Sequence, residues 1–373
     1  MKKSVLITVL LLISPLFSHA EPLELRGELS SWLSYRDLAP DYSLLGLRYI
    51  PQVSLAKALS NGRKIDGLVS ANINFEAPTD RLQINDENSE TEFYRLWARW
   101  SSNQFEARAG LQKINFGPAK ILRSLRWFDT IDARDPSGLT DGVKGLLLRY
   151  YALDNTNIWL WGLYGNDEIK GLEVAPTDGA RPELGGRYQT PMINGEMAIS
   201  LHHRKIDRDE WRSSQAFGLI TSNLIDGGED RIAIDGFWDV EIGLWFEAVA
   251  GRIKVDSNLD LWGEQMTIGA DYTLDSGIHI LGEHFVMATG DAWDKTVRGR
   301  STSALSADYG ISIMDRINSI ITYDWVEHET QGFIGWQRTY DDWRIDLLGF
   351  SGPEVGSGKF SGDRVELIVT YNH

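Results

Sequence analysis

The chain has 373 residues and a formal charge of −16 at pH 7, from 37 Lys and Arg against 53 Asp and Glu. An acidic chain repels phosphate, so we expect no nucleic-acid partner. The absence of Cys excludes disulfides, iron–sulfur clusters and thiol catalysis. The 36 Gly and 14 Trp, with ordinary hydrophobicity, disfavour a helical membrane protein and leave all-β classes open.

The N-terminal segment has the pattern of a secretory signal peptide. Lys2 and Lys3 precede an apolar stretch over residues 5–17, and small residues end it at Ala20. We expect cleavage after Ala20, which would leave residues 21–373 as an exported mature chain. The alternative is a short membrane anchor, but the stretch is too short to span a bilayer comfortably. No other segment has 18 consecutive apolar residues, so we expect no transmembrane helix.

The mature chain reads as a series of short β-strands. In residues 69–76, 266–272 and 364–371, apolar side chains alternate with polar ones, so each segment has one apolar face. Short turns rich in Asn, Asp and Gly alternate with longer polar connections. The short turns lie at residues 60–62, 102–103, 154–155, 193–195, 239–240, 275–277, 315–316 and 341–342.

The longer connections lie near residues 37–42, 77–92, 118–142, 166–181, 207–229, 255–259, 290–300 and 351–359, with one short exception near residue 329. This alternation predicts an all-β fold, a closed antiparallel transmembrane β-barrel of about 18 strands. Short turns would face the periplasm and long loops the outside. A soluble propeller or solenoid is the alternative, but it would show a repeat of fixed period, and we find none.

Two segments resemble Gram-negative outer-membrane porins. The last strand, residues 366–373, is similar to the barrel-assembly signal of that superfamily, with Tyr371 third from the end and His373 in place of the usual final Phe or Trp. Residues 110–117, with 126–136 after them, resemble the stretch of alginate-export-type porins that reads Gly-Arg-Gln, Phe-Gly, then Arg and Phe-Asp in a loop folding into the pore. Leu111 replaces that Arg. The resemblance implies an outer-membrane location, with lipids, lipopolysaccharide and the barrel-assembly machinery as partners.

The connection over residues 118–142 is the candidate pore constriction. It mixes charges of both signs with apolar residues that could pack against a wall, which suits a loop folded into a pore. We expect three arginines on one side of the opening and three aspartates on the other; an external loop is the alternative. The candidate residues are Lys120, Arg123, Arg126, Asp129, Asp132, Arg134 and Asp135.

Strand alternation also predicts a charged inner wall. A charge facing lipid at midplane costs about 2–4 kcal/mol, so charged residues on strands should face the lumen. They would either attract anions or pair with acidic residues to stiffen the wall. We expect Arg99 to lie directly opposite Glu106 across the hairpin at 102–103, a pair contributing ~0.2–1 kcal/mol. The predicted wall residues are Arg95, Arg99, Glu106, Arg108, Arg149, Arg187, His202 and Arg204.

These features predict a passive channel for small polar, anionic solutes, with no catalytic residue, cofactor or metal. The spacing of His279, Glu283 and His284 resembles an inverted zinc motif, but on a strand these side chains do not converge. The acidic segment 86–92 lacks the spacing of a calcium loop. Two alternatives stay open: an outer-membrane barrel enzyme using His202 or His203, and a closed scaffold barrel that anchors a partner.

Overall fold

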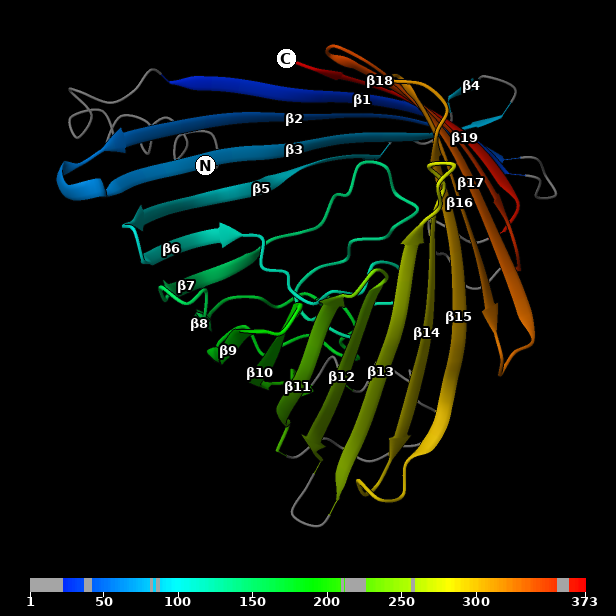
Figure 1. Ribbon diagram of the computed structural model, residues 1–373. Coiled ribbons are helices and arrows are strands. Elements are labelled where there is room, and N and C mark those ends of the chain that lie inside the picture. The colour runs from blue at the N-terminus through cyan, green and yellow to red at the C-terminus, as the bar shows by residue number, and fades with distance from the viewer. Residues whose placement is uncertain are drawn as a thin grey trace.

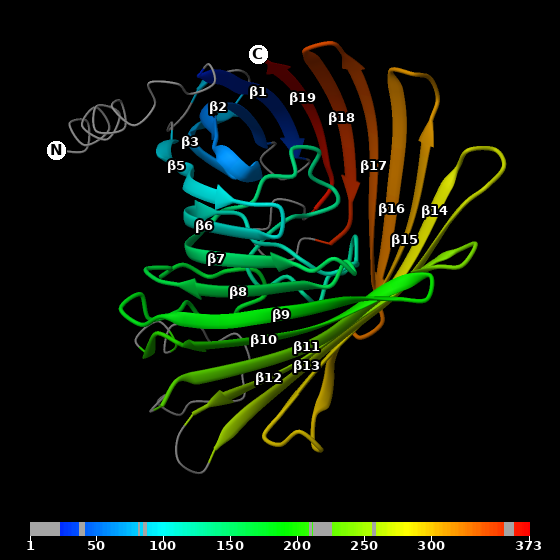
Figure 2. The ribbon, with the colours of Figure 1, turned by 60° about the vertical axis from the view of Figure 1, so that its left-hand side comes forward.

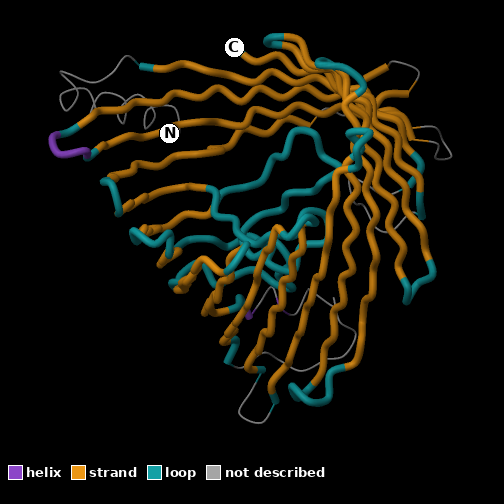
Figure 3. Tube along the Cα trace, in the orientation of Figure 1, coloured by secondary structure: helices purple, strands orange, loops and turns teal. Residues whose placement is uncertain are grey.

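The computed structural model describes residues 23–36, 42–80, 83–84, 88–208, 211, 226–255, 259–353 and 362–373, and nearly all of its regular structure is β (Figure 1, Figure 3). The predicted signal peptide lies outside these residues. A short 3-10 turn, η2, spans Ser60–Gly62. No helix in the described ranges is long and apolar enough to cross a membrane.

The strands follow one another along the chain as an antiparallel series. They are β1 (Glu24–Arg36), β2 (Tyr42–Ala58), β3 (Lys64–Asp80), β4 (Gln83–Ile84), β5 (Asn88–Ser101), β6 (Phe105–Gln112), β7 (Val143–Tyr151), β8 (Asn157–Leu163), β9 (Glu183–Met192), β10 (Gly195–Lys205), β11 (Gly228–Asp239), β12 (Gly243–Lys254), β13 (Asp260–Thr273), β14 (His279–Gly290), β15 (Val297–Gly310), β16 (Asp315–Asp324), β17 (Glu329–Tyr340), β18 (Trp343–Ser351) and β19 (Arg364–Asn372).

The sheet closes into a barrel because β1 pairs with both β2 and β19 (Figure 2). β4 pairs over two residues with β3 alone, while β3 also pairs with β5, so β4 lies outside the main wall. The other 18 strands form the wall, each antiparallel to its neighbours. The predicted closed barrel of about 18 strands is therefore confirmed.

Short hairpins lie at one end of this barrel and longer connections at the other, as the sequence predicts. Asn61, Asn155 and Asn194 stand in short turns with φ between 57° and 65°, a region that Asn tolerates better than most residues. The short exception expected near residue 329 is the turn that joins β16 to β17. Hairpin chemistry thus explains the alternation of connection lengths.

Apolar side chains point outward and polar ones inward along the strands. On β13, Met266 and Ile268 are 49% and 47% exposed, whereas Thr267 between them is fully buried. This is the reverse of a soluble protein, and it suits a wall whose outer face meets lipid. The predicted apolar faces at 69–76 and 364–371 follow the same rule.

The seam between β1 and β19 closes at the C-terminus. The backbone N–H of Gly27 donates to the carbonyl of His373 at 2.9 Å, and the N–H of His373 donates to the carbonyl of Gly27 at 3.0 Å. The His373 ring stacks on Tyr49 with 5.9 Å between centroids. A Cβ at Gly27 would lie 2.4 Å from the imidazole, so glycine makes room for it. His373 therefore fills the space beside Gly27 and Tyr49 at the end of the seam.

Candidate constriction site

The loop between β6 and β7, residues 113–142, runs through the inside of the barrel (Figure 1, Figure 3). Its first turn lies at Gly117, which has φ +97° and is followed by Pro118. Glycine adopts this backbone conformation without steric strain, and proline then fixes the next φ. The break expected at Gly117-Pro118 thus directs the chain inward, and the connection does not lie outside the barrel.

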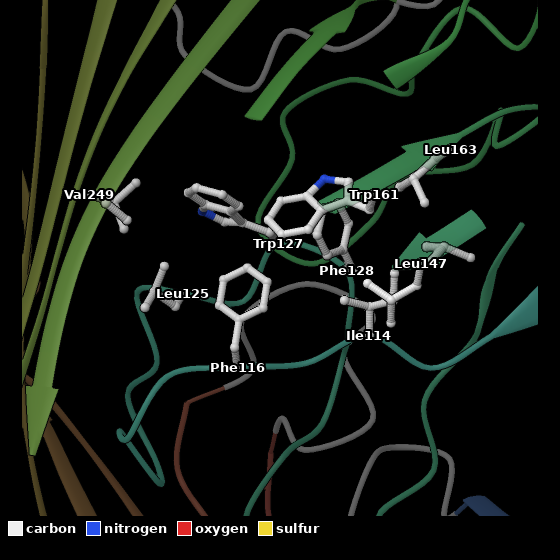
Figure 4. Close-up of a cluster of buried hydrophobic side chains, with 11 residues drawn as sticks. Ile114, Phe116, Leu125, Trp127, Phe128, Leu147, Trp161, Leu163 and Val249 are labelled. Atoms are coloured by element: carbon white, nitrogen blue, oxygen red, sulfur yellow. The ribbon is translucent and has the colours of Figure 1, made fainter. Parts of the chain in front are cut away.

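Aromatic side chains of the loop pack against the barrel wall at β8. Phe116, Trp127 and Phe128 of the loop surround Trp161 of β8 (Figure 4). The rings of Phe116 and Trp161 stack with centroids 5.8 Å apart, and Phe128 meets Trp161 edge-on at 5.6 Å. All four side chains are buried. Such aromatic burial is worth several kcal/mol in total, at about 1.5–3 kcal/mol per large side chain.

A carboxylate on β12 binds the same loop at a second part of the barrel wall. Glu247 accepts hydrogen bonds from the backbone N–H groups of Ala119 at 3.0 Å and Leu125 at 2.8 Å. On the neighbouring strand β13, the hydroxyl of Thr267 lies 2.8 Å from that of Ser124. The side chains of Glu247 and Thr267 are fully buried. These wall residues therefore bind the loop backbone directly.

A second carboxylate, Glu283 of β14, binds three consecutive N–H groups. Lys120 donates to one carboxylate oxygen at 2.7 Å, and Ile121 and Leu122 donate to the other at 2.9 and 2.6 Å. The indole N–H of Trp245 adds a fourth bond at 3.0 Å. Hydrogen bonds to a charged group contribute about 1.5–3 kcal/mol each. The loop is thus held across the lumen, from β8 to β14.

Two of the loop's three arginines are paired with aspartates of the loop, which corrects the two-sided arrangement expected from the sequence. Arg123 pairs with Asp129, one of the two contacts being 3.1 Å. Arg134 pairs with Asp132 at 2.8 Å. Asp135 accepts hydrogen bonds from the N–H and hydroxyl of Ser137 at 2.9 and 2.6 Å. The arginines and aspartates are only a few residues apart on one chain, so they neutralise each other and do not line opposite sides.

Three cations of this loop have no such partner. Within the described ranges, no carboxylate oxygen lies within 4.0 Å of the charged nitrogens of Lys113, Lys120 or Arg126. Burial lowers the pKa of Arg126, and nearby Asp132 and Asp129 only partly oppose this effect. Burial likewise lowers the pKa of Lys113. Arg126 and Lys113 are therefore partly desolvated cations, whereas Lys120 is exposed.

The predicted pair of Arg99 and Glu106 forms, but diagonally. Arg99 lies opposite Arg108 in the sheet register, and Glu106 lies opposite Ser101, because the chain turns at Asn103 and Gln104, one position later than expected. Arg99 still reaches Glu106 at 3.2 Å, and it binds Asp66 more closely, at 2.8 and 3.0 Å. The expectation of a directly opposed pair was therefore wrong in register.

The wall over β5–β7 carries an excess of positive charge. The Glu106 carboxylate also forms ion pairs with the guanidinium groups of Arg108, at 2.8 Å, and Arg149, at 3.8 Å. Arg95 donates to a backbone carbonyl, that of Thr140, at 2.7 Å. Four guanidinium groups here face two carboxylates. We call this set the basic wall patch; it consists of Arg95, Arg99, Arg108 and Arg149, with Asp66 and Glu106.

The remaining predicted wall residues are buried structural partners. Arg187 binds both oxygens of Asp235 at 2.6 and 2.7 Å. His202 is enclosed by aromatic rings: its Nδ1 accepts from the Trp161 indole at 3.1 Å, so its Nε2 carries the proton toward Glu183 at 3.2 Å. Arg204 is fully buried in an ion-pair network. The neighbouring His203 points to the outer face, where it pairs with exposed Asp230 at 2.7 Å.

Cavities of about 320 and 220 Å³ lie beside the loop, both lined by residues near the short-turn end of the barrel. The larger has aromatic and charged walls. Its lining includes Phe116, Lys120, Trp159, Arg187, Glu196 and Phe237. The smaller is lined in part by Arg134, Asp308, Arg316 and Asp346. In the described part of the chain, no three His, Asp or Glu side chains gather as a metal site.

Sequence reasoning missed Glu247, Glu283 and the whole contribution of the loop over residues 164–182. Strand alternation places both glutamates on inward faces, which was a usable signal. Their partners are backbone N–H groups of a distant loop, however, and these have no sequence signature. The pattern of connection lengths predicts a long outer loop near residues 166–181, yet the side chain of Glu173 within it is fully buried against wall arginines.

No protein-family model and no curated protein sequence matches the chain. Solved structures match it by fold. Acinetobacter baumannii OccAB1 has a TM-score of 0.59 at 9% identity, over 95% of this chain and 98% of that one. Pseudomonas aeruginosa OprD has a TM-score of 0.57 at 10% identity, over 95% and 97%. The Vibrio cholerae outer membrane protein OmpT, described in a trimer form, has a TM-score of 0.54 at 11% identity, over 94% and 99%.

At such low identities the likeness is one of fold, and the alginate-export-type resemblance stays a prediction. Each similarity covers nearly the whole of both chains, so it concerns the complete barrel. The protein is an 18-stranded β-barrel of the outer-membrane type.

Proposed function

We propose that the chain is an outer-membrane channel for passive diffusion of small polar solutes, with a preference for anions. The charge arrangement of the loop 113–142 carries the proposal. Its Asp129 and Asp132 are each bound by an arginine of the same loop, while Arg126 and Lys120 have no carboxylate within 4.0 Å in the described ranges. Uncompensated positive charge at a narrow part of a pore attracts anions and repels cations.

The basic wall patch supports the same preference. Its four guanidinium groups and two carboxylates lie on β3 and β5–β7, the strands next to the point where the loop leaves and rejoins the wall. An anion that approaches the loop along this wall would meet a net positive field. The proposal involves no catalytic step and no cofactor.

Arg126 is the best single position for the test. Replacing Arg123 or Arg134 would also release a paired aspartate, which would confuse the result. Arg126→Gln removes one charge without breaking an ion pair found in the described residues. Arg181→Gln is the control at an exposed position: Arg181 lies in the next loop, its side chain is 68% exposed, and its ion pair with the exposed Asp178 is long, at 3.9 Å.

The measurement is the reversal potential of the purified protein in a planar bilayer under a salt gradient. We expect the wild type to prefer anions, Arg126→Gln to shift the reversal potential toward zero, and Arg181→Gln to leave it unchanged. An unchanged reversal potential for Arg126→Gln would show that the charge of Arg126 in this loop does not set the ion selectivity. A folded barrel without any conductance would favour the closed scaffold instead.

A further inference from the structure

The loop that joins β8 to β9, residues 164–182, has a backbone contact with the constriction loop at Arg126. The N–H of Leu172 donates to the carbonyl oxygen of Arg126 at 3.0 Å. The preceding residue, Gly171, has φ +53°, and a Cβ built there would lie 1.8 Å from the same carbonyl oxygen. The two backbones approach this closely because residue 171 has no side chain.

Buried ion pairs fix this second loop to the barrel wall. Glu173 is fully buried and lies 3.0 Å from Arg204 of β10 and 3.5 Å from Arg231 of β11. Lys170 of the same loop lies 3.3 Å from both Glu173 and Glu183. The loop therefore contributes charges of both signs to the network, and it is bound to three successive strands, β9 to β11.

The charges of this network balance. Three cations face three carboxylates, all in side chains that are at least nine-tenths buried, and His202 beside them is the neutral tautomer described above. Removing one member would leave an uncompensated buried charge, which is strongly unfavourable. The network should therefore hold the loop in one position. Its members are Lys170, Glu173, Glu183, Arg204, Glu229 and Arg231.

We propose that residues 164–182 form a positioning loop for the selectivity of the pore. Glu173 fixes the loop to the wall, and Gly171 with Leu172 fixes the backbone of Arg126. No described carboxylate holds the guanidinium of Arg126, so its position follows that of its backbone, which the Leu172 contact fixes together with the bond from Leu125 to Glu247 and the burial of Trp127. Gly171 and Glu173 are then positioning residues, although they carry no charge that meets the solute. This inference rests on the proposed role of Arg126.

The test is Gly171→Ala with Gly165→Ala as its control. Gly165 lies in the same loop and has a similar positive φ of +73°, but a Cβ there would meet nothing within 4 Å. Both substitutions impose left-handed strain on alanine, and only the first displaces Arg126. We expect Gly171→Ala to shift the reversal potential by at least half the shift of Arg126→Gln. Gly165→Ala should match the wild type.

A coupling measurement completes the design. In the Arg126→Gln background, Gly171→Ala should cause no further shift, because the charge that it displaces is gone. If Gly171→Ala yields no folded barrel, Leu172→Pro removes the N–H that donates to Arg126 without adding a Cβ at residue 171 or changing a charge, and it should shift the reversal potential in the same direction.

Folding is checked for every variant by the heat-dependent change in gel mobility. The inference is wrong if folded Gly171→Ala keeps the wild-type value, or if Gly165→Ala shifts equally. If Arg126→Gln shifts the reversal potential but Gly171→Ala does not, the positioning role of residues 164–182 is wrong and the proposed function still stands. When Arg126→Gln does not shift, the proposed function has failed.

Discussion

Replacing Glu283 by glutamine should release part of the constriction loop. The carboxylate accepts four hydrogen bonds, two on each oxygen. A glutamine amide keeps one oxygen as an acceptor and presents an NH₂ group to the other two donors. Two charge-assisted bonds are then lost, at about 1.5–3 kcal/mol each. The loss of roughly 3–6 kcal/mol lowers the ratio of docked to released loop by about two to four orders of magnitude, since ~1.4 kcal/mol is tenfold.

The assay is single-channel recording of Glu283→Gln in planar bilayers. A released loop leaves a wider and less constant opening, so we expect higher conductance and greater open-channel noise than in the wild type. Glu196→Gln is the control. It removes the same charge from an exposed inward-facing side chain whose described hydrogen bond goes to Gln189. Conductance and noise of the control should stay at wild-type values.

Two results would refute the reasoning. If Glu283→Gln has wild-type conductance and noise, Glu247 and the aromatic contacts hold the loop without Glu283. If Glu196→Gln shows the same increase, the effect comes from lost lumen charge and not from the released N–H groups.

Two further predictions concern charged pairs. Arg99→Ala should lower the free energy of unfolding by about 1–3 kcal/mol in a urea titration in lipid vesicles, more than a single exposed pair, because Asp66 and Glu106 both lose a partner; an unchanged midpoint would contradict this. Burial acts to raise the pKa of Asp132, but hydrogen bonds and charge from Arg134 outweigh it and hold the pKa below its usual range. The Arg134–Asp132 pair therefore stabilises the loop at neutral pH and is lost only as pH falls through that depressed value. Arg134→Gln should move the onset of acid-induced channel noise to higher pH, and an identical onset in both proteins would count against the pairing.

Much of the wall could be predicted from the sequence because the alternation of apolar and polar side chains along each strand reflects the lipid on one face and the lumen on the other. Met266 and Ile268 alternate with Thr267 since one face meets lipid and the other the lumen. The turns at Asn155 and Asn194 were recognisable because their chemistry is local. These signals need no knowledge of distant contacts, and together they fix the number of strands and the direction in which each side chain points.

The site was harder to predict because its contacts are long-range. A turn placed one residue later than expected moved the partner of Glu106 from Arg99 to Ser101 in the register. Arg123 and Asp129 pair through the path of the loop, which no periodicity reports. Glu283 meets the N–H of Lys120, 163 residues away, and backbone donors look alike in any sequence.

The seam between β1 and β19 sets the order in which this molecule can be completed. Its side chains Ser30 and Thr370 are 340 positions apart, and closing a chain segment of that length costs about 5 kcal/mol of entropy. Nine residue pairs form along the seam, and their contacts offset this entropy only when the whole of the last strand docks. Both inward loops lie within the ring that this strand completes. Protease resistance of the interior should therefore arise late in assembly, together with closure, and a chain without its last strand would keep two open edges.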